Sequence, residues 1–178
     1  MNKIYKLQKI LLLTLLCTFL TVYQTAWAQV SSYIFASASG TYTPITGGTV
    51  VVATTATPPA DEDIFLNLPI GFSFTYNDVP YTDFGITANG LVIFGANGDE
   101  GAVAPLTFDL SQILGLGEIR YQTTGTAPNR VCTVQFSNWA NNLSAGDIYN
   151  FQIKLRETTN TATVVYGNIT AVDRKSVV

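Results

Sequence analysis

The sequence predicts an all-β protein, an antiparallel β-sandwich of about nine or ten strands that forms a single domain behind a signal peptide. Three observations support this fold class. Apolar and polar residues alternate over short segments, turn-forming residues lie between those segments, and no segment keeps a helical period. Strands joined by short turns, without crossover helices, are typical of two packed antiparallel sheets.

Residues 1–28 have the features of a secretory signal peptide. Three lysines precede an apolar segment at 10–22, and Ala26-Trp27-Ala28 matches an A-x-A cleavage site. The apolar segment is shorter than the roughly 20 residues that a membrane span needs, which favours cleavage over an uncleaved anchor. We therefore expect a mature chain that begins at Gln29, is exported, and has no membrane span after cleavage.

The last six residues, 173–178, differ from the preceding chain in their charge density. Their sequence, DRKSVV, looks like the translation of a common sequencing adapter, so we expect a non-native tail here. The domain is then expected to cover 29–172 and to continue into a longer natural protein. A genuine polar tail is the alternative, and the underlying nucleotide sequence distinguishes the two.

The charge balance disfavours anionic partners. The whole chain has 9 basic and 12 acidic residues, and the two ends together contain five of the basic residues and one acid. The remaining 144 residues have four basic groups against 11 carboxylates, a net charge of −7. Such a chain is the size of one ordinary domain, and its charge repels phosphate backbones and anionic lipids. Nucleic-acid binding is therefore not expected.

The first half of the domain contains four predicted strands before its central hairpin. They lie at Tyr33–Ala36, Thr49–Thr54, Ile64–Leu68 and Ile70–Tyr76, and Asn77-Asp78 closes the last of them. The next strand begins at Tyr81, so the chain from Pro69 to Gly95 is predicted to form three consecutive antiparallel strands.

The central hairpin spans Phe84–Gly95, with Asn89-Gly90 between two apolar segments. This pair predicts a two-residue type I′ turn, because asparagine tolerates and glycine readily adopts a positive φ. The turn would set Ile86 opposite Ile93. One face would then contain Phe84, Ile86, Ala88, Leu91 and Ile93, and the other Thr87, Val92 and Phe94.

The second half begins with an irregular segment, 96–117, in which a helical turn is expected near 111–114. Strands follow at Glu118–Gln122, Arg130–Phe136 and 149–156, and the last of these pairs with a strand that contains Ala162, Val164 and Tyr166. The clearest alternation places Tyr149, Phe151, Ile153 and Leu155 inward, and Asn150, Gln152, Lys154 and Arg156 toward water.

Several segments together resemble a known family: GTYTPITGGT, LPIGFSFTYNDVPYTDFGITANGLVIFG, IRYQTTGTAPNRVCTVQFSNW and NFQIKLRETTNTATVVYG. They are similar to the amino-terminal β-sandwich of large secreted surface proteins of Bacteroidetes, many of which carry a type IX secretion sorting domain, and to nidogen-like extracellular domains. The resemblance covers nearly all of 33–167. It implies an extracellular module beside adhesion or enzyme domains and transfers no catalytic residue. At 104–109 relatives often have an aromatic residue and paired acids, whereas this chain has Thr107 and the single Asp109.

The residue types argue against catalysis. The chain contains no histidine, which excludes Ser-His-Asp and Cys-His catalysis and histidine-ligated zinc. Lys154 is predicted to face outward, and the spacing of Asp109, Glu118 and Glu157 does not force these carboxylates together, as a glycosidase would require. Cys132, the one cysteine after the leader, lies on the apolar side of its strand and is expected to be buried. We predict no enzyme, no catalytic residue and no cofactor.

Two acidic loops offer oxygen atoms of the kind that bind calcium. One contains Asp61, Glu62 and Asp63, and the other contains Asn97, Asp99 and Glu100. Neither has the spacing of an EF-hand, so solvated loop charge is the competing interpretation and no metal site is assigned.

A third region, Ser137–Asn142, has the composition of a glycan-binding surface around Trp139, although a tryptophan directly after a core strand is typical of packing.

We therefore expect a non-catalytic extracellular or cell-surface interaction module, adhesive in character, at the amino-terminal end of a longer secreted protein. Its partner would be an unknown extracellular protein or glycan. The alternative is an accessory domain beside a secreted protease or glycosidase domain located downstream. A spacer without any ligand is a third possibility.

Overall fold

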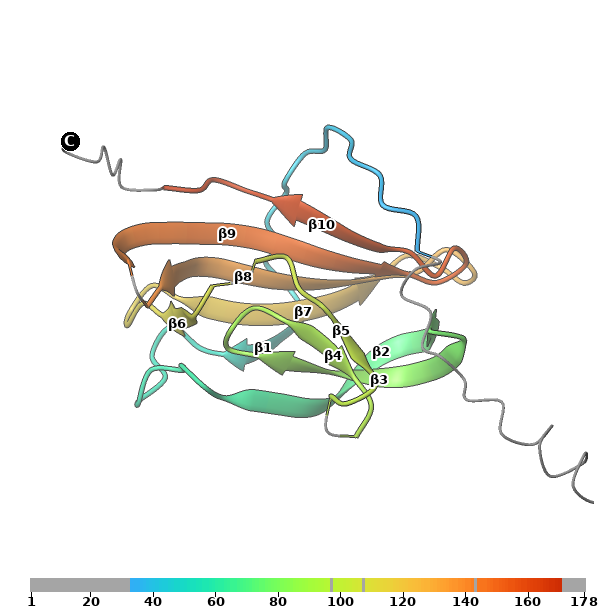
Figure 1. Ribbon diagram of the computed structural model, residues 1–178, viewed down its shortest axis with the longest axis horizontal. Helices are drawn as coiled ribbons and strands as arrows, with labels where there is room; N and C mark the ends of the chain where they lie inside the picture. Colours follow the sequence, from blue (N-terminus) through green and yellow to red (C-terminus); the bar gives the residue numbers. More distant parts are fainter. Residues whose placement is uncertain (1–32, 97, 107, 143, 171–178) are drawn as a thin grey trace, which may run out of the picture. The chain divides into compact units, whose positions relative to one another are not determined.

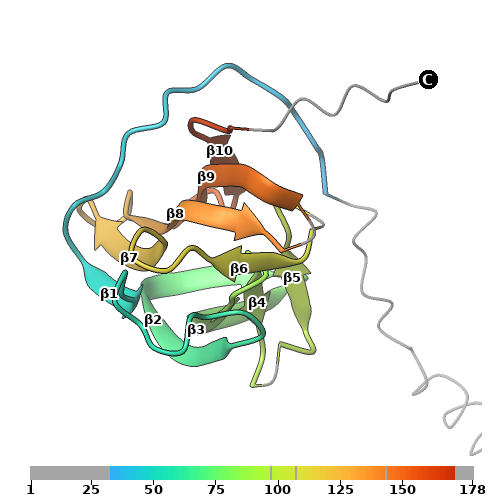
Figure 2. The ribbon, with the colours of Figure 1, turned by 90° about the vertical axis from the view of Figure 1, so that its left-hand side faces the viewer.

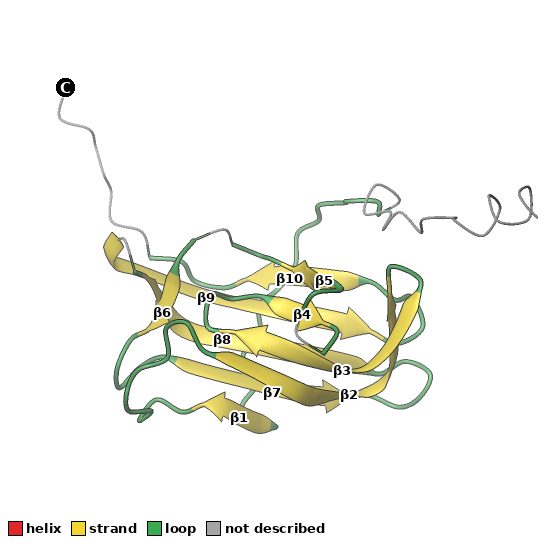
Figure 3. Cartoon of the chain, turned by 60° about the horizontal axis from the view of Figure 1, so that its bottom comes forward, coloured by secondary structure: helices red, strands yellow, loops and turns green. Residues whose placement is uncertain are grey.

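The computed structural model describes residues 33–96, 98–106, 108–142 and 144–170. The predicted signal peptide at 1–28 and the predicted tail at 173–178 lie outside these residues. All of the described β-structure belongs to one compact unit that begins at Ala36. Residues 33–35 belong to a separate unit and themselves form no strand or helix. Figure 3 shows strands and loops but no helix in the described chain, and so no helix there is long and apolar enough to cross a membrane.

The described chain forms ten strands in two antiparallel sheets, and Figure 1 shows the two layers. The large sheet has the order β1-β7-β8-β9-β10, with β6 also paired to β8, and the small sheet has the order β2-β3-β4-β5. This arrangement confirms the predicted all-β sandwich. The strand bounds are β1 Thr49–Val52, β2 Ile64–Tyr76, β3 Val79–Thr87, β4 Val92–Phe94, β5 Gly101–Val103, β6 Leu110–Gln112, β7 Glu118–Thr124, β8 Val131–Asn141, β9 Ser144–Arg156 and β10 Ala162–Tyr166.

The hydrophobic core lies between the two sheets and is rich in aromatic rings. Phe136 and Phe151 stack with their centroids 4.6 Å apart in the large sheet, and Phe74 and Phe94 stack at 5.6 Å in the small sheet. Stacked and edge-on aromatic pairs of this kind add stability beyond the apolar area they bury. The predicted inward set on β9 is confirmed, because Tyr149, Phe151, Ile153 and Leu155 are all buried in this core.

The central hairpin exists, but the predicted register is wrong. Ile86 pairs with Val92, and Gly85 pairs with Ile93. The Gly90 N–H donates to the Thr87 carbonyl at 3.0 Å, and of the loop residues 88–90 only Gly90 has a positive φ, +85°. This is a three-residue loop with glycine in the left-handed position, the next most common hairpin after the two-residue type.

The shift of one residue reverses the faces of β4. Val92 and Phe94, predicted on the opposite face from Ile86, are fully buried in the core with it. Ile93, predicted to share that inner face, instead lies outside the core cluster and against Gly85. A two-residue turn of the kind predicted at Asn89-Gly90 occurs instead in the preceding hairpin, between β2 and β3. Asn77 and Asp78 have φ values of +48° and +61° and connect the paired residues at the ends of β2 and β3.

Three other expectations are corrected by the structure. The predicted strand at Tyr33–Ala36 is absent from the described chain. The two predicted strands on either side of Pro69 form one strand, β2, in which Asn67 and Gly71 take positive φ at irregularities in its pairing with β3. The helical turn expected near 111–114 is replaced by strand β6, because its residues pair with the end of β8.

Candidate functional site

A cluster of three carboxylates lies where several loops meet at one end of the sandwich. Asp61 and Glu62 come from the β1–β2 connection, and Asp109 comes from the residue before β6. One carboxylate oxygen from each lies within 4.8 Å of the others. The acidic loop predicted from the sequence instead combines Asp61 and Glu62 with Asp63. Asp63 is not part of this cluster. Its carboxylate accepts a hydrogen bond from the Asp61 N–H, and its carbonyl accepts one from the Ala88 N–H.

Two asparagines connect the loops that carry this cluster. Asn89, at the tip of the central hairpin, donates to Glu62 at 3.1 Å and accepts from the Leu110 N–H at 2.8 Å. Asn142 donates through its side chain to Asp61 at 3.4 Å and through its backbone N–H to the Asp109 carbonyl at 2.8 Å. The two asparagine side chains therefore bind Glu62 and Asp61, and a backbone hydrogen bond positions the residue Asp109 beside them.

The cluster offers the ligand type that a hard cation prefers, since calcium binds carboxylate and carbonyl oxygens. If the chain holds such a cation, Asp61, Glu62 and Asp109 are the residues that would bind it. Asp109 Oδ1 is buried without a hydrogen-bond partner, whereas the Glu62 side chain is exposed to solvent. The other predicted loop is different. Asn97 lies outside the described residues, and within the described chain Asp99 and Glu100 do not join a third carboxylate, histidine or cysteine.

The three carboxylates considered for catalysis lie in separate environments. Asp109 belongs to the acidic cluster, Glu118 forms an ion pair with Arg120, and Glu157 forms one with Arg130. The hydrogen bonds from Arg130 lower the pKa of Glu157 to about 2. A carboxyl group with so low a pKa stays ionised at neutral pH and is poorly suited to act as a general acid.

Trp139 and Cys132 are both buried. The Trp139 ring is fully buried, and its indole N–H donates to the Ala88 carbonyl at 2.6 Å, so the ring packs in the core and is not a platform for a glycan. Cys132 is also fully buried, and burial raises the pKa of its thiol to about 11. A thiol with this pKa is protonated at neutral pH and is therefore a poor nucleophile.

A row of three polar side chains crosses the outer face of the large sheet. Arg120 on β7, Gln135 on β8 and Gln152 on β9 lie side by side in the strand register. We call these residues the polar row. Gln152 was predicted to point into water, but this is wrong, because its side chain is completely buried. Figure 2 shows the chain before β1 passing outside the large sheet, and part of this segment covers the row.

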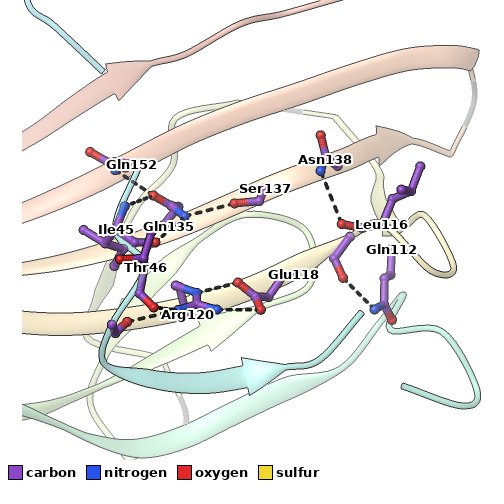
Figure 4. Close-up of polar contacts among 12 residues, drawn as sticks. Ile45, Thr46, Gln112, Leu116, Glu118, Arg120, Gln135, Ser137, Asn138 and Gln152 are labelled. Atoms are coloured by element: carbon purple, nitrogen blue, oxygen red, sulfur yellow. Dashed lines mark hydrogen bonds and ion pairs between the residues drawn. The ribbon is translucent and has the colours of Figure 1, made fainter. Parts of the chain in front are cut away.

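The covering segment, residues 41–47, is called the strap. Figure 4 shows its contacts with the polar row. Gln152 donates to the Thr43 carbonyl at 2.8 Å, and Arg120 donates to the Thr46 carbonyl at 2.6 Å. Gln135 accepts from the Ile45 N–H at 2.8 Å and donates to the carbonyl of the same residue at 3.3 Å. Sequence reasoning missed this surface, since no local pattern indicates that a distant segment covers the outer face of the sheet.

The comparison with protein families decides the class. A family model described as NIDO related matches residues 32–177.

The chain belongs to the nidogen-related family.

The match includes all ten strands, so the nidogen-related domain and the β-sandwich described here are the same unit. The resemblance to nidogen-like extracellular domains is confirmed, and the nidogen-related class suggests an extracellular interaction module. No curated protein and no solved structure matches the chain. The assignment to Bacteroidetes and to type IX secretion stays a prediction.

Proposed function

We propose that this nidogen-related domain is a non-catalytic adhesion module, exposed on the outer cell surface or secreted, at the amino-terminal end of a longer protein. The observation that carries the proposal is the family match over 32–177, because the nidogen-related class suggests an extracellular interaction role. The signal-peptide pattern at residues 1–28 is consistent with export.

The chemistry of the described side chains supports a binding role over a catalytic one. Two of the three carboxylates considered for catalysis are paired with arginines, the cysteine is buried and protonated, and the whole chain lacks histidine. The acidic charge balance favours a protein or glycan partner over an anionic lipid surface. An accessory role beside a hydrolase domain stays the alternative prediction.

Adhesion is tested with beads that display the purified exported chain, applied to a panel of immobilised polysaccharides and glycoproteins that includes chitin and mucin. We expect saturable retention on at least one surface, and no retention of beads that display the same chain unfolded in urea. Release of sugars or peptides from the panel would contradict the non-catalytic role. Equal retention of folded and unfolded beads, or no retention on any surface, would contradict adhesion.

A further inference from the structure

The polar row recognises the main chain of the strap. Every hydrogen bond from Arg120, Gln135 and Gln152 to the strap goes to a backbone N–H or carbonyl. Gln135 binds both polar backbone groups of Ile45, in the way that a neighbouring strand would in a sheet. No strap side chain takes part in these bonds, so the row binds the strap through its backbone.

The strap is attached to the domain in a way that allows it to leave. It contains no strand, so no ladder of the two sheets depends on it. It joins β1 through Gly47-Gly48, and Gly48 has a φ of +83°. A Cβ on Gly48 would lie 2.2 Å from the Tyr121 carbonyl oxygen, which excludes larger residues in this conformation. Two consecutive glycines give the connection the freedom of a hinge.

The docked strap leaves one polar atom of the row unmatched. Gln152 donates to Thr43 and to Gln135, but its Oε1 atom is buried without a hydrogen-bond partner. A buried acceptor without a donor is unfavourable, so it reduces the net gain from docking. Most strap residues are exposed to solvent, and only Tyr42 and Ile45 are half-buried. The docked position is therefore built from a few polar bonds and two partly buried side chains.

We propose that the polar row is a self-association surface on which the strap of a second copy of this chain replaces the chain's own strap. A second copy is the favoured occupant because its strap has the same backbone, the same glycine hinge and the same two half-buried side chains. In a dimer that exchanges straps, each strap would make the same hydrogen bonds to a polar row that it makes in the monomer. Exchange of an identical element is therefore an inexpensive route to a dimer. The inference goes beyond the proposed adhesion and does not depend on it.

The monomer, in which the strap binds its own row, is favoured over the exchanged dimer at low protein concentration, and this sets the concentration range of the experiment. A strap tethered to its own row acts at an effective concentration of roughly millimolar, so exchange becomes visible only as the chain approaches that concentration. Analytical ultracentrifugation of the purified exported chain from about 10 µM to about 1 mM covers this range. We expect the dimer fraction to rise with concentration and to fall when a synthetic peptide of residues 40–48 is added in millimolar amounts.

Two complementary variants test whether the strap itself makes the dimer. The first combines Gln135→Ala with Gln152→Ala, which damages the row and leaves the strap intact. The second is Ile45→Pro, which removes the backbone N–H that donates a hydrogen bond to Gln135 and leaves the row intact. Neither variant should dimerise alone, whereas a mixture should form a heterodimer in which the strap of the first binds the row of the second. Lys154→Ala, on the same strand as Gln152, serves as the matched control and should dimerise like the natural chain.

Each outcome supports or overturns the proposal. A natural chain that stays monomeric up to about 1 mM overturns it, as do variants that dimerise alone as well as the natural chain. Circular dichroism shows whether both variants retain the sandwich. If either is unfolded, the peptide competition decides on the natural chain alone, and a dimer fraction that does not respond to the peptide overturns the proposal.

Discussion

The indole N–H of Trp139 donates a 2.6 Å hydrogen bond to the carbonyl of Ala88, and this bond joins the two sheets of the sandwich. Trp139 lies on β8 of the large sheet, and Ala88 lies in the loop between β3 and β4 of the small sheet. The same loop contains Asn89, which contacts Glu62 of the acidic cluster. One buried tryptophan therefore fixes the position of the loop that helps to arrange the carboxylates.

Replacing Trp139 by phenylalanine should destabilise the protein. The variant Trp139→Phe leaves the Ala88 carbonyl unpaired and opens a small cavity in the core, which together cost about 2–4 kcal/mol. The free energy of unfolding in urea, followed by circular dichroism, measures the loss. Leu116→Ala is the control, because Leu116 is 54% exposed and its truncation should have little effect. Equal losses in the two variants would contradict the structural role of the tryptophan.

Adding a methyl group at Gly90 should lower the free energy of unfolding more than adding one at Gly115. Both glycines have φ near +80°, so alanine is strained at each. A Cβ at Gly90 would also lie 2.9 Å from Leu110 Cδ1 and 3.0 Å from Phe151 Cζ, whereas a Cβ at Gly115 would meet nothing within 4 Å. We expect Gly115→Ala to cost about 1 kcal/mol and Gly90→Ala about 1–3 kcal/mol more. Chemical denaturation of both variants checks the difference, and similar losses would show that the register described for this hairpin is wrong.

The pair of Glu157 and Arg130 should make stability depend on pH in acid. The Glu157 carboxylate accepts hydrogen bonds from the side chain and from the backbone N–H of Arg130, and the pKa of Glu157 in the folded protein is about 2. An unfolded glutamate has a pKa near 4.3, so between about pH 2 and 4.3 the unfolded chain binds more protons than the folded one. The contribution of Glu157 is therefore complete above this window and is lost as the pH falls through it.

The variant Glu157→Gln tests this dependence. Its urea midpoint should fall less steeply than that of the natural chain between about pH 5 and pH 2, and the two should converge at the acid end. Asp83→Asn, which neutralises an exposed acid on β3, provides the control and should keep the natural slope. An unchanged slope in Glu157→Gln would contradict the assignment.

The acidic cluster should be a source of repulsion when no cation is present. Carboxylate oxygens of Asp61, Glu62 and Asp109 lie within 4.8 Å of one another, and Asp109 Oδ1 has no partner. In a buffer that contains EDTA, Asp109→Asn should therefore raise the free energy of unfolding by about 0.5 kcal/mol. Differential scanning calorimetry compares this variant with Asp99→Asn, which lies outside the cluster and should leave the melting temperature unchanged. A loss of stability in Asp109→Asn would contradict the repulsive arrangement.

The sequence predicts those parts of the fold in which local pattern and burial agree. The inward residues of β9 follow a period of two because one side of the strand faces the core. The register of the central hairpin could not be predicted, because Asn-Gly is compatible with both a two-residue and a three-residue loop. Contacts of Asn89 with Glu62 and with the Leu110 N–H accompany the longer loop, and these contacts come from other parts of the chain.

The candidate site was predictable only in part, for a similar reason. Asp61 and Glu62 stand out as acids in a loop, but the approach of Asp109 depends on the pairing of β6 with β8. Gln152 donates to the carbonyl of Thr43, which is 109 positions earlier in the chain. An alternating strand pattern distinguishes the core face from the outer face. It does not indicate whether another segment covers the outer face.

Labelling of intact cells shows whether this nidogen-related module acts outside the cell. Antibodies against the sandwich would be applied to intact cells and to permeabilised cells of the natural host, and to the culture medium. For an extracellular module we expect signal on intact cells or in the medium, with little increase after permeabilisation. Signal that appears only after permeabilisation would contradict an extracellular location.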